Sequence, residues 1–322
     1  MSPIEFSKPR SSLFDVVLGA CVSGPRSSRT GIVLVAAAAA LWGCWSLCFK
    51  SAERLSTTVL SATTETAVVF IVMLLSMLPL ALLTRRRQER AGSMAARPAS
   101  AWALLMLLGC TDAANGLAFF QAMQTTSVAI AVLTHYLTPL IVALLAPLVL
   151  KEKMRGSTLI ALAIALSGLV LLLRPWTDVS SKDIAGASLG ALSAIFYASN
   201  VFLGKRLFSS FNSFEVAAWP KLSSVTILVA AALLQGDAVV ETAPLLVLLA
   251  GGFLCGSVPT VLFYAGLQRI AASQASVLTL VEPLVAVVVG VVVWQEALHP
   301  LGIVGGLCVL GGAVIIARAQ AA

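Results

Sequence analysis

Long, nearly uncharged stretches of apolar residues are the feature that most restricts how this chain can fold. From Gly31 to Arg318 they recur at a spacing that fits about ten segments with short connections. A membrane-spanning helix needs about 20 mainly apolar residues, whereas a spanning β-strand would alternate apolar and polar residues. Runs such as Leu284–Val293 do not alternate. The sequence therefore predicts an all-α membrane protein with ten transmembrane helices, which satisfy their own backbone hydrogen bonds.

The composition agrees with a chain whose outer surface faces lipid. It is 59% apolar and only 11% charged, about half the charged fraction of a soluble domain. Residues 1–30 are rich in Ser, Pro and Arg and are interpreted as a cytoplasmic tail, with an organelle-targeting segment as the alternative. The predicted helices are Gly31–Phe49, Thr58–Leu83, Ala101–Gln121, Thr126–Leu150, Ser157–Leu173, Ile184–Lys205, Ser213–Leu234, Pro244–Leu267, Ala272–Trp294 and Leu301–Ala317.

The basic residues predict the orientation of these helices. If the N-terminus is cytoplasmic, 16 of the 21 Lys and Arg residues fall in cytoplasmic segments and only 4 in the opposite ones. Because basic residues gather on the cytoplasmic side of membrane proteins, we expect a multi-pass protein of the cell membrane with both termini cytoplasmic. The same distribution accounts for the net charge of +7 without a nucleic-acid partner.

No residue pattern predicts a cofactor or a metal site. Five of the six cysteines lie in predicted spans and none forms a CxxC motif. They are interpreted as small apolar packing residues rather than as a disulfide framework or metal ligands. The motif GxxxxGK[ST] is absent from the sequence, so ATP is not expected to be the direct energy source.

Internal repetition divides the chain into two halves. A shift of 144 residues pairs Pro139 with Pro283 and Glu152 with Glu296 without a gap. Each half contains five predicted helices, and because five is odd the second half must enter the membrane in the opposite direction. Inverted repeats around a central cavity are a common plan of secondary transporters. The predicted five-helix repeats are residues 31–175 and 184–318.

The repeated segment resembles a known family. Gln124–Glu152, with a proline in its middle and a glutamate at its end, resembles the signature of EamA-type carriers of the drug/metabolite transporter superfamily, and Gln268–Glu296 resembles it again. Leu41–Gly43 is similar to part of the family's usual opening helix. The resemblance implies ten helices, a central cavity, and export or exchange of amino acids, related metabolites or drugs. The family's second helix often begins with a basic residue, whereas Ser61–Thr66 contains none, so the local substrate chemistry is expected to differ.

Ionisable side chains inside the predicted spans are candidates for function, because lipid makes them costly. They are Glu65, Asp112, His135, Lys221 and Glu282. At about 1.5 Å of rise per residue, Asp112, His135 and Glu282 lie near the membrane midplane, where carriers place their sites. Carboxylates in an apolar cavity would suit proton-coupled exchange. Glu65 and Lys221 occupy nearly equivalent places in the two halves, but inversion puts them toward opposite faces, which disfavours a direct ion pair.

Three prolines, Pro139, Pro283 and Pro259, are expected to interrupt helices at the same depth and to free backbone groups for a cavity. The alternative interpretation is that each polar group bonds to a neighbouring helix and each aromatic residue packs or lies at the interface. The predicted lining combines polar and aromatic side chains: Asp112, Asn115, His135, Thr138, Glu282, Trp42, Trp45, Tyr136, Tyr197 and Tyr264.

The predicted function is a secondary transporter of small metabolites (amino acids, amines or drug-like solutes) that exports them by alternating access. Its expected partners are the lipid bilayer and a small-molecule substrate, and a monomer is compatible with the sequence. The alternative is an intramembrane enzyme acting on lipid or prenyl substrates. The chain has only two histidines, His135 and His299, and no clustered Asp motif, which disfavours that enzyme.

Overall fold

A computed structural model of the chain describes residues 28–58, 60–92, 97–126, 128–153, 155–174, 176, 183–236, 240–295, 297 and 299–319. Ten helical segments within these residues are long and apolar enough to cross a membrane, which confirms the predicted number. Nearly all of the predicted N-terminal tail lies outside the described residues.

Five of the ten spans are single uninterrupted helices. They are α4 (Ala62–Arg90), α5 (Ala99–Thr125), α8 (Gly156–Leu173), α9 (Asp183–Leu207) and α16 (Pro300–Arg318).

The other five spans are interrupted near their middle. Four consist of two helices each, and the fifth contains a π-helical turn, η1, between two α-helices. The pieces are α2 (Ser28–Trp42) and α3 (Trp45–Leu55), α6 (Val128–His135) and α7 (Thr138–Val149), α10 (Ser213–Ala218) and α11 (Lys221–Gln235), α12 (Thr242–Gly251), η1 (Gly252–Ser257) and α13 (Val258–Leu267), and α14 (Ala272–Leu278) and α15 (Val281–Trp294).

Prolines account for the breaks in the fourth and ninth spans. Pro139 has no N–H for the carbonyl of His135, and the Thr138 hydroxyl donates to that carbonyl instead, at 2.8 Å. In the ninth span Pro283 leaves the carbonyl of Thr279 free, and the Glu282 N–H donates to it at 3.0 Å. The two helices therefore stop and restart at nearly equivalent places in the two halves.

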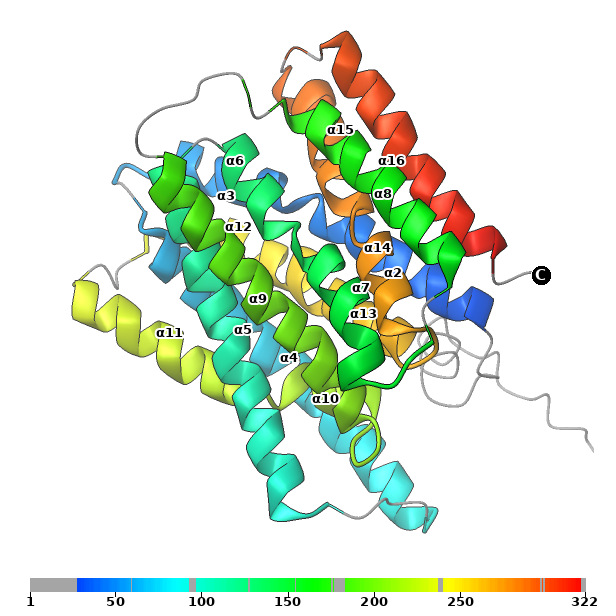
Figure 1. The fold of residues 1–322 in the computed structure, drawn as a ribbon. Helices are drawn as coiled ribbons and strands as arrows, with labels where there is room; N and C mark the ends of the chain where they lie inside the picture. The colour runs from blue at the N-terminus through cyan, green and yellow to red at the C-terminus, as the bar shows by residue number, and fades with distance from the viewer. Residues whose placement is uncertain are drawn as a thin grey trace, which may run out of the picture.

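Helices of the first half pack mainly against helices of the second half. The principal pairs are α5 with α9, α2 with α13, α4 with α11, α3 with α12, and α8 with α16, as Figure 1 shows for the long α5–α9 and α8–α16 pairs. Between α8 and α16 the backbones approach closely, because a Cβ atom on Gly168 would lie 2.6 Å from the carbonyl oxygen of Gly305. The inverted relation of the halves and the cytoplasmic position of the termini stay predictions.

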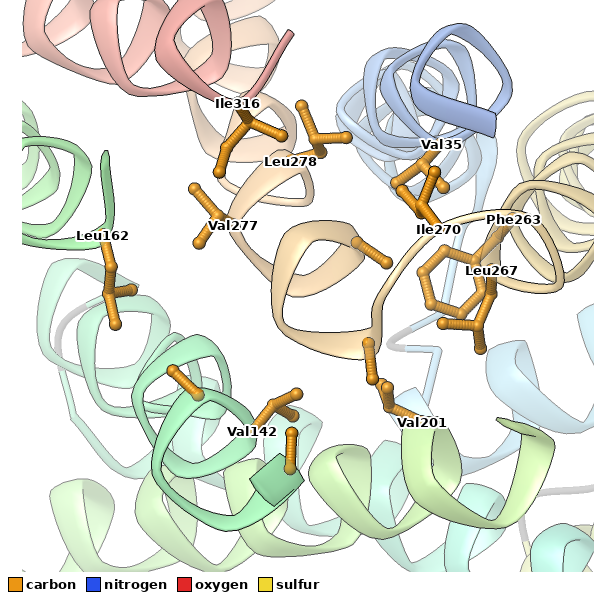
Figure 2. Packing of buried hydrophobic residues seen from close by; sticks show 14 of the residues in the cluster. Val35, Val142, Leu162, Val201, Phe263, Leu267, Ile270, Val277, Leu278 and Ile316 are labelled. Atoms are coloured by element: carbon orange, nitrogen blue, oxygen red, sulfur yellow. The ribbon is translucent and has the colours of Figure 1, made fainter. Parts of the chain in front are cut away.

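The bundle has two distinct ends. We call the end where α4 and α9 stop and α5 and α8 begin the basic end, because it carries the arginines of α4, and the other the opposite end. At the basic end, apolar side chains converge on the short helix α14 (Figure 2). They include Val35 of α2, Val142 of α7, Leu162 of α8 and Ile316 of α16. Burying these side chains closes the basic end of the bundle around α14.

The first span is longer than predicted. We expected it to end at Phe49, before the charged residues Lys50 and Arg54, but α3 continues to Leu55. The cations of Lys50 and Arg54 lie 5.6 and 4.4 Å from the ring centroid of Trp294. This cation–π contact, together with the length of the side chains, accommodates the charges at the end of the span.

Candidate functional site

A cavity of about 180 Å³ lies in the middle of the bundle and extends toward the opposite end. We call it the central cavity. It is lined by seven of the residues that the sequence predicted for such a site, Trp42, Trp45, Asp112, Asn115, His135, Tyr197 and Glu282, and also by Phe49, Thr66, Val69, Phe70, Met73, Gly116, Phe119, Phe120, Lys221 and Thr260.

Asp112 and Lys221 form an ion pair on the wall of the central cavity. The Lys221 ammonium lies 2.5 Å from Oδ2 of Asp112, and the Ser224 hydroxyl lies 3.2 Å from the same oxygen. Lys221 also lies over the ring of Phe70, 4.1 Å from its centroid. Lys221 therefore pairs with Asp112 and not with Glu65.

The local sequence explains how this pair is positioned. The helix is interrupted at Trp219 and Pro220, so Lys221 is the first residue of α11. Helix α5 comes within contact of this break because Gly109 has no side chain: a Cβ atom there would lie 1.9 Å from the carbonyl oxygen of Pro220. One turn after Gly109, α5 presents Asp112 to Lys221.

His135, the last residue of α6, is oriented by a hydrogen bond outside the cavity. Its Nδ1 lies 2.8 Å from the Ser193 hydroxyl, and that hydroxyl donates its proton to the carbonyl of Gly190 at 2.7 Å. Because serine has one proton, Nδ1 acts as the donor and Nε2 is the nitrogen available to a bound molecule. The imidazole stacks on Tyr197, with ring centroids 5.4 Å apart.

Glu282 reaches the cavity from the first turn of α15, just after the break at Thr279 and Leu280. Its carboxylate lies next to the Tyr136 hydroxyl, and no basic side chain within the described ranges pairs with it. Asn115 adds an unused acceptor, because its Oδ1 is buried without a hydrogen-bond partner. A bound donor could satisfy both oxygen groups.

Three residues predicted for the lining lie behind it. The side chain of Thr138 is buried, and its hydroxyl donates to the carbonyls of His135 and Ala194. Tyr136 is 3% exposed and packs in an apolar cluster. Tyr264 lies against Gly204, where a Cβ atom would be 2.6 Å from its ring.

Two further predicted features lie outside the cavity wall. Glu65 is buried in the first turn of α4, and its Oε1 has no hydrogen-bond partner. Pro259 is the second residue of α13, which directly follows the π-helical turn η1, where the Ser257 hydroxyl bonds to both Gly252 and Ser76. This bonding satisfies backbone that the irregular turn leaves free.

The sequence did not predict a continuous series of aromatic rings across the cavity. Trp45 stacks on Phe49 at 5.2 Å, Phe49 meets Phe120 edge-on at 5.6 Å, and Phe119 joins Phe120 to His135. The predicted lining contained tryptophans and tyrosines but no phenylalanine. The repeat gave one unused signal, because Phe119 corresponds to Phe263, and Phe263 packs against Trp42.

Within the described part of the chain, no group of three or more His, Cys, Asp or Glu side chains could hold a metal ion. The central cavity brings together Glu282, the Asp112–Lys221 ion pair, the imidazole of His135 and several aromatic rings.

Comparison with known proteins places this architecture in context. The model of the EamA-like transporter family matches residues 29–174 and 184–318. An uncharacterized transporter of Archaeoglobus fulgidus is 29% identical over 62% of this chain and 71% of its own length. The threonine/homoserine exporter RhtA of Salmonella typhimurium is 26% identical over 64% of this chain and 68% of its own. One crystal structure has a TM-score of 0.74 at 20% identity, covering 90% of this chain and 98% of its own, and it supports the fold alone.

Proposed function

Since the chain belongs to the EamA-like transporter family, it is a membrane transporter, and we propose that it exports small metabolites that carry a protonated amino group. The observation that carries the proposal is the convergence of Glu282, the Asp112–Lys221 pair and His135 on one cavity deep in an otherwise apolar bundle. Charged groups at this depth are costly and are kept for function.

The charge balance of the central cavity favours a cationic group. Lys221 neutralises Asp112 at 2.5 Å, so Glu282 is the carboxylate left to attract a cation. Trp42 and Trp45 line the same space, and aromatic rings attract cations as well. A protonated amine therefore fits beside Glu282.

Amino acids are one class of solute that meets this requirement. The Salmonella typhimurium relative, a threonine/homoserine exporter, supports amino acids as substrates of this chain too. In such a solute the carboxylate would require a donor, and the Lys221 ammonium, which lines the same cavity as Glu282, can supply one. Simple amines and drug-like cations need only the contact with Glu282.

The bonds between the two halves favour transport by alternating access. At the basic end, Arg97 pairs with the fully buried Glu215 at 3.0 Å, and Glu152 accepts from the backbone N–H of Ala272 at 2.8 Å. At the opposite end Glu241 accepts from Thr57 and Thr58 at the surface. With the predicted orientation, this arrangement corresponds to a carrier closed toward the cytoplasm. Rearrangement of the contacts at both ends would expose the cavity to each side of the membrane in turn.

Transport is coupled to protons if Glu282 binds the proton and the ammonium group of the solute in turn. The carboxylate can hold a proton or the ammonium group of a solute, but not both. A proton entering from the outside would then release the solute, and the proton would leave on the inner side. The carrier would act as a solute/proton antiporter.

The proposal is tested by flux in proteoliposomes that contain the full chain. Threonine, homoserine, ethylamine and tetramethylammonium would be followed with and without a pH gradient. We expect at least one to move, and we expect Glu282→Gln to abolish acceleration by the gradient while Glu89→Gln, on the exposed surface, does not. If no solute moves, the export proposal is wrong, and if flux in Glu282→Gln keeps its response to pH, the coupling proposal is wrong.

A further inference from the structure

A second cavity of about 380 Å³ adjoins the central cavity on the side of the opposite end. We call it the vestibule. It is formed between α4, α5 and α9, with Gln235 at the end of α11. Thr66 and Phe120 line both cavities, so these two side chains separate the vestibule from the central cavity.

The vestibule differs from the central cavity in chemistry. Every residue lining it within the described chain is uncharged, and its polar groups are hydroxyls and amides such as those of Thr63, Gln121 and Gln235. These three lie near the ends of their helices. The charged side chains that line the central cavity do not line the vestibule. The vestibule therefore offers no counter-charge to a solute, only apolar contact and a polar rim.

The apolar wall of the vestibule lies at the depth of the lipid chains. Leu192 follows the start of α9 by nine residues, which is roughly 14 Å of helix, and the hydrocarbon core is about 30 Å thick. Leu192 is 42% exposed, so protein does not cover this wall of the vestibule completely. Phe196, farther along the same wall, precedes Tyr197 of the central cavity.

We propose that the vestibule is a second binding site, which accepts the aliphatic or aromatic tail of an amine whose cationic group is held at Glu282, and that Phe120 is the movable partition between the two sites. The inference rests on the proposed function and names its substrate class: amphipathic amines. Phe120 contacts Phe49 and Phe119 only through ring edges and tilted faces, so a rotation of its side chain would join the two cavities.

The test measures binding of ethylamine, butylamine and hexylamine to the full chain in lipid nanodiscs. A tail that enters an apolar site gains affinity of about fourfold per methylene. We expect this rise in the native protein, and we expect it to fall below about 1.5-fold per methylene in Leu117→Trp, which fills the vestibule from α5. Leu107→Trp is the matched control, because Leu107 lies on the same helix, is 47% exposed and does not line the vestibule.

A second variant keeps the test decisive if Leu117→Trp fails to fold. Gln121 lines the vestibule from an exposed position, so Gln121→Trp fills it without disturbing the core, and the same loss of chain-length dependence is expected. Equal dependence in both filled variants and in Leu107→Trp would show partitioning into lipid and overturn the inference. If ethylamine binds in a Glu282-dependent manner but longer tails gain nothing, only the inference is wrong. If no amine binds at all, it is overturned together with the proposed function.

Discussion

Replacing Asp112 by asparagine would leave the Lys221 ammonium without its counter-charge inside the bundle. The side chain of Lys221 is 6% exposed and that of Asp112 is 22% exposed. Removing one partner of a buried ion pair costs about 3–5 kcal/mol. The contact of Lys221 with Phe70 remains, and water can approach through the central cavity. We therefore expect Asp112→Asn to lower the free energy of unfolding by about 2–3 kcal/mol.

A double-mutant cycle separates the pair from its surroundings. Lys221→Met removes the buried charge, so the double variant Asp112→Asn/Lys221→Met should recover part of the loss, with a coupling energy of about 1.5 kcal/mol or more. Unfolding would be measured in mixed micelles by titration with dodecyl sulfate, followed by tryptophan fluorescence. The exposed pair Arg85–Glu89, at 2.9 Å, supplies the control, because Glu89→Gln should cost about 0.5 kcal/mol or less.

The reasoning is refuted by either of two results. One is a loss below about 0.5 kcal/mol for Asp112→Asn, which would mean that Lys221 reaches water or another partner. The other is strict additivity of the two substitutions, which would mean that the two side chains do not interact in the folded protein.

Three further predictions concern stability. Gly109→Ala should destabilise the bundle by about 1–3 kcal/mol, since its Cβ would lie 1.9 Å from the carbonyl oxygen of Pro220, whereas Gly311→Ala, with open space around it, should have little effect in the same unfolding titration. Thr138→Val should cost about 1–2 kcal/mol, because it removes the donor to the His135 carbonyl that Pro139 leaves free, and Thr226→Val, which removes only a hydroxyl bonded within its own helix, should cost less. Hydrogen bonds from the Thr57 side chain and backbone lower the pKa of Glu241. The native protein should therefore be more stable than Glu241→Gln at neutral pH, and this difference should be lost as the pH falls through the lowered pKa. A stability difference between the two proteins that is equal at pH 7 and pH 3, in thermal unfolding scans, would contradict this.

The sequence predicted those features that depend on one helix at a time. The ten spans follow from the length of apolar runs, and the places where Pro139 and Pro283 interrupt helices follow from the missing N–H of proline. Depth along a helix follows from its rise, and the structure brings Asp112, His135 and Glu282 to one cavity. These quantities do not require knowledge of which helices are neighbours.

Features that depend on how helices are rotated against each other were not predicted. The pairing of Asp112 with Lys221 requires α5 to approach the break before α11, and this approach depends on the absence of a side chain at Gly109. The partition formed by Phe120 requires α3, α4 and α5 to meet at one level. Tyr136 and Tyr264 were expected in the cavity lining, but Tyr136, in the turn between α6 and α7, and Tyr264, in α13, are directed into the surrounding packing.

The pairing of helices across the two halves has a consequence for biosynthesis. The principal partners of α2, α3, α4, α5 and α8 belong to the second half. When the first five helices have entered the membrane, about 144 residues up to Arg318 are still to be made, which takes on the order of 7–30 s at usual rates of translation. During this interval Gly168 of α8 and the carboxylate of Asp112 lack their partners, so the nascent first half depends on lipid or on the insertion machinery to cover them. Assembly of the bundle is therefore a late event that begins with the synthesis of α9.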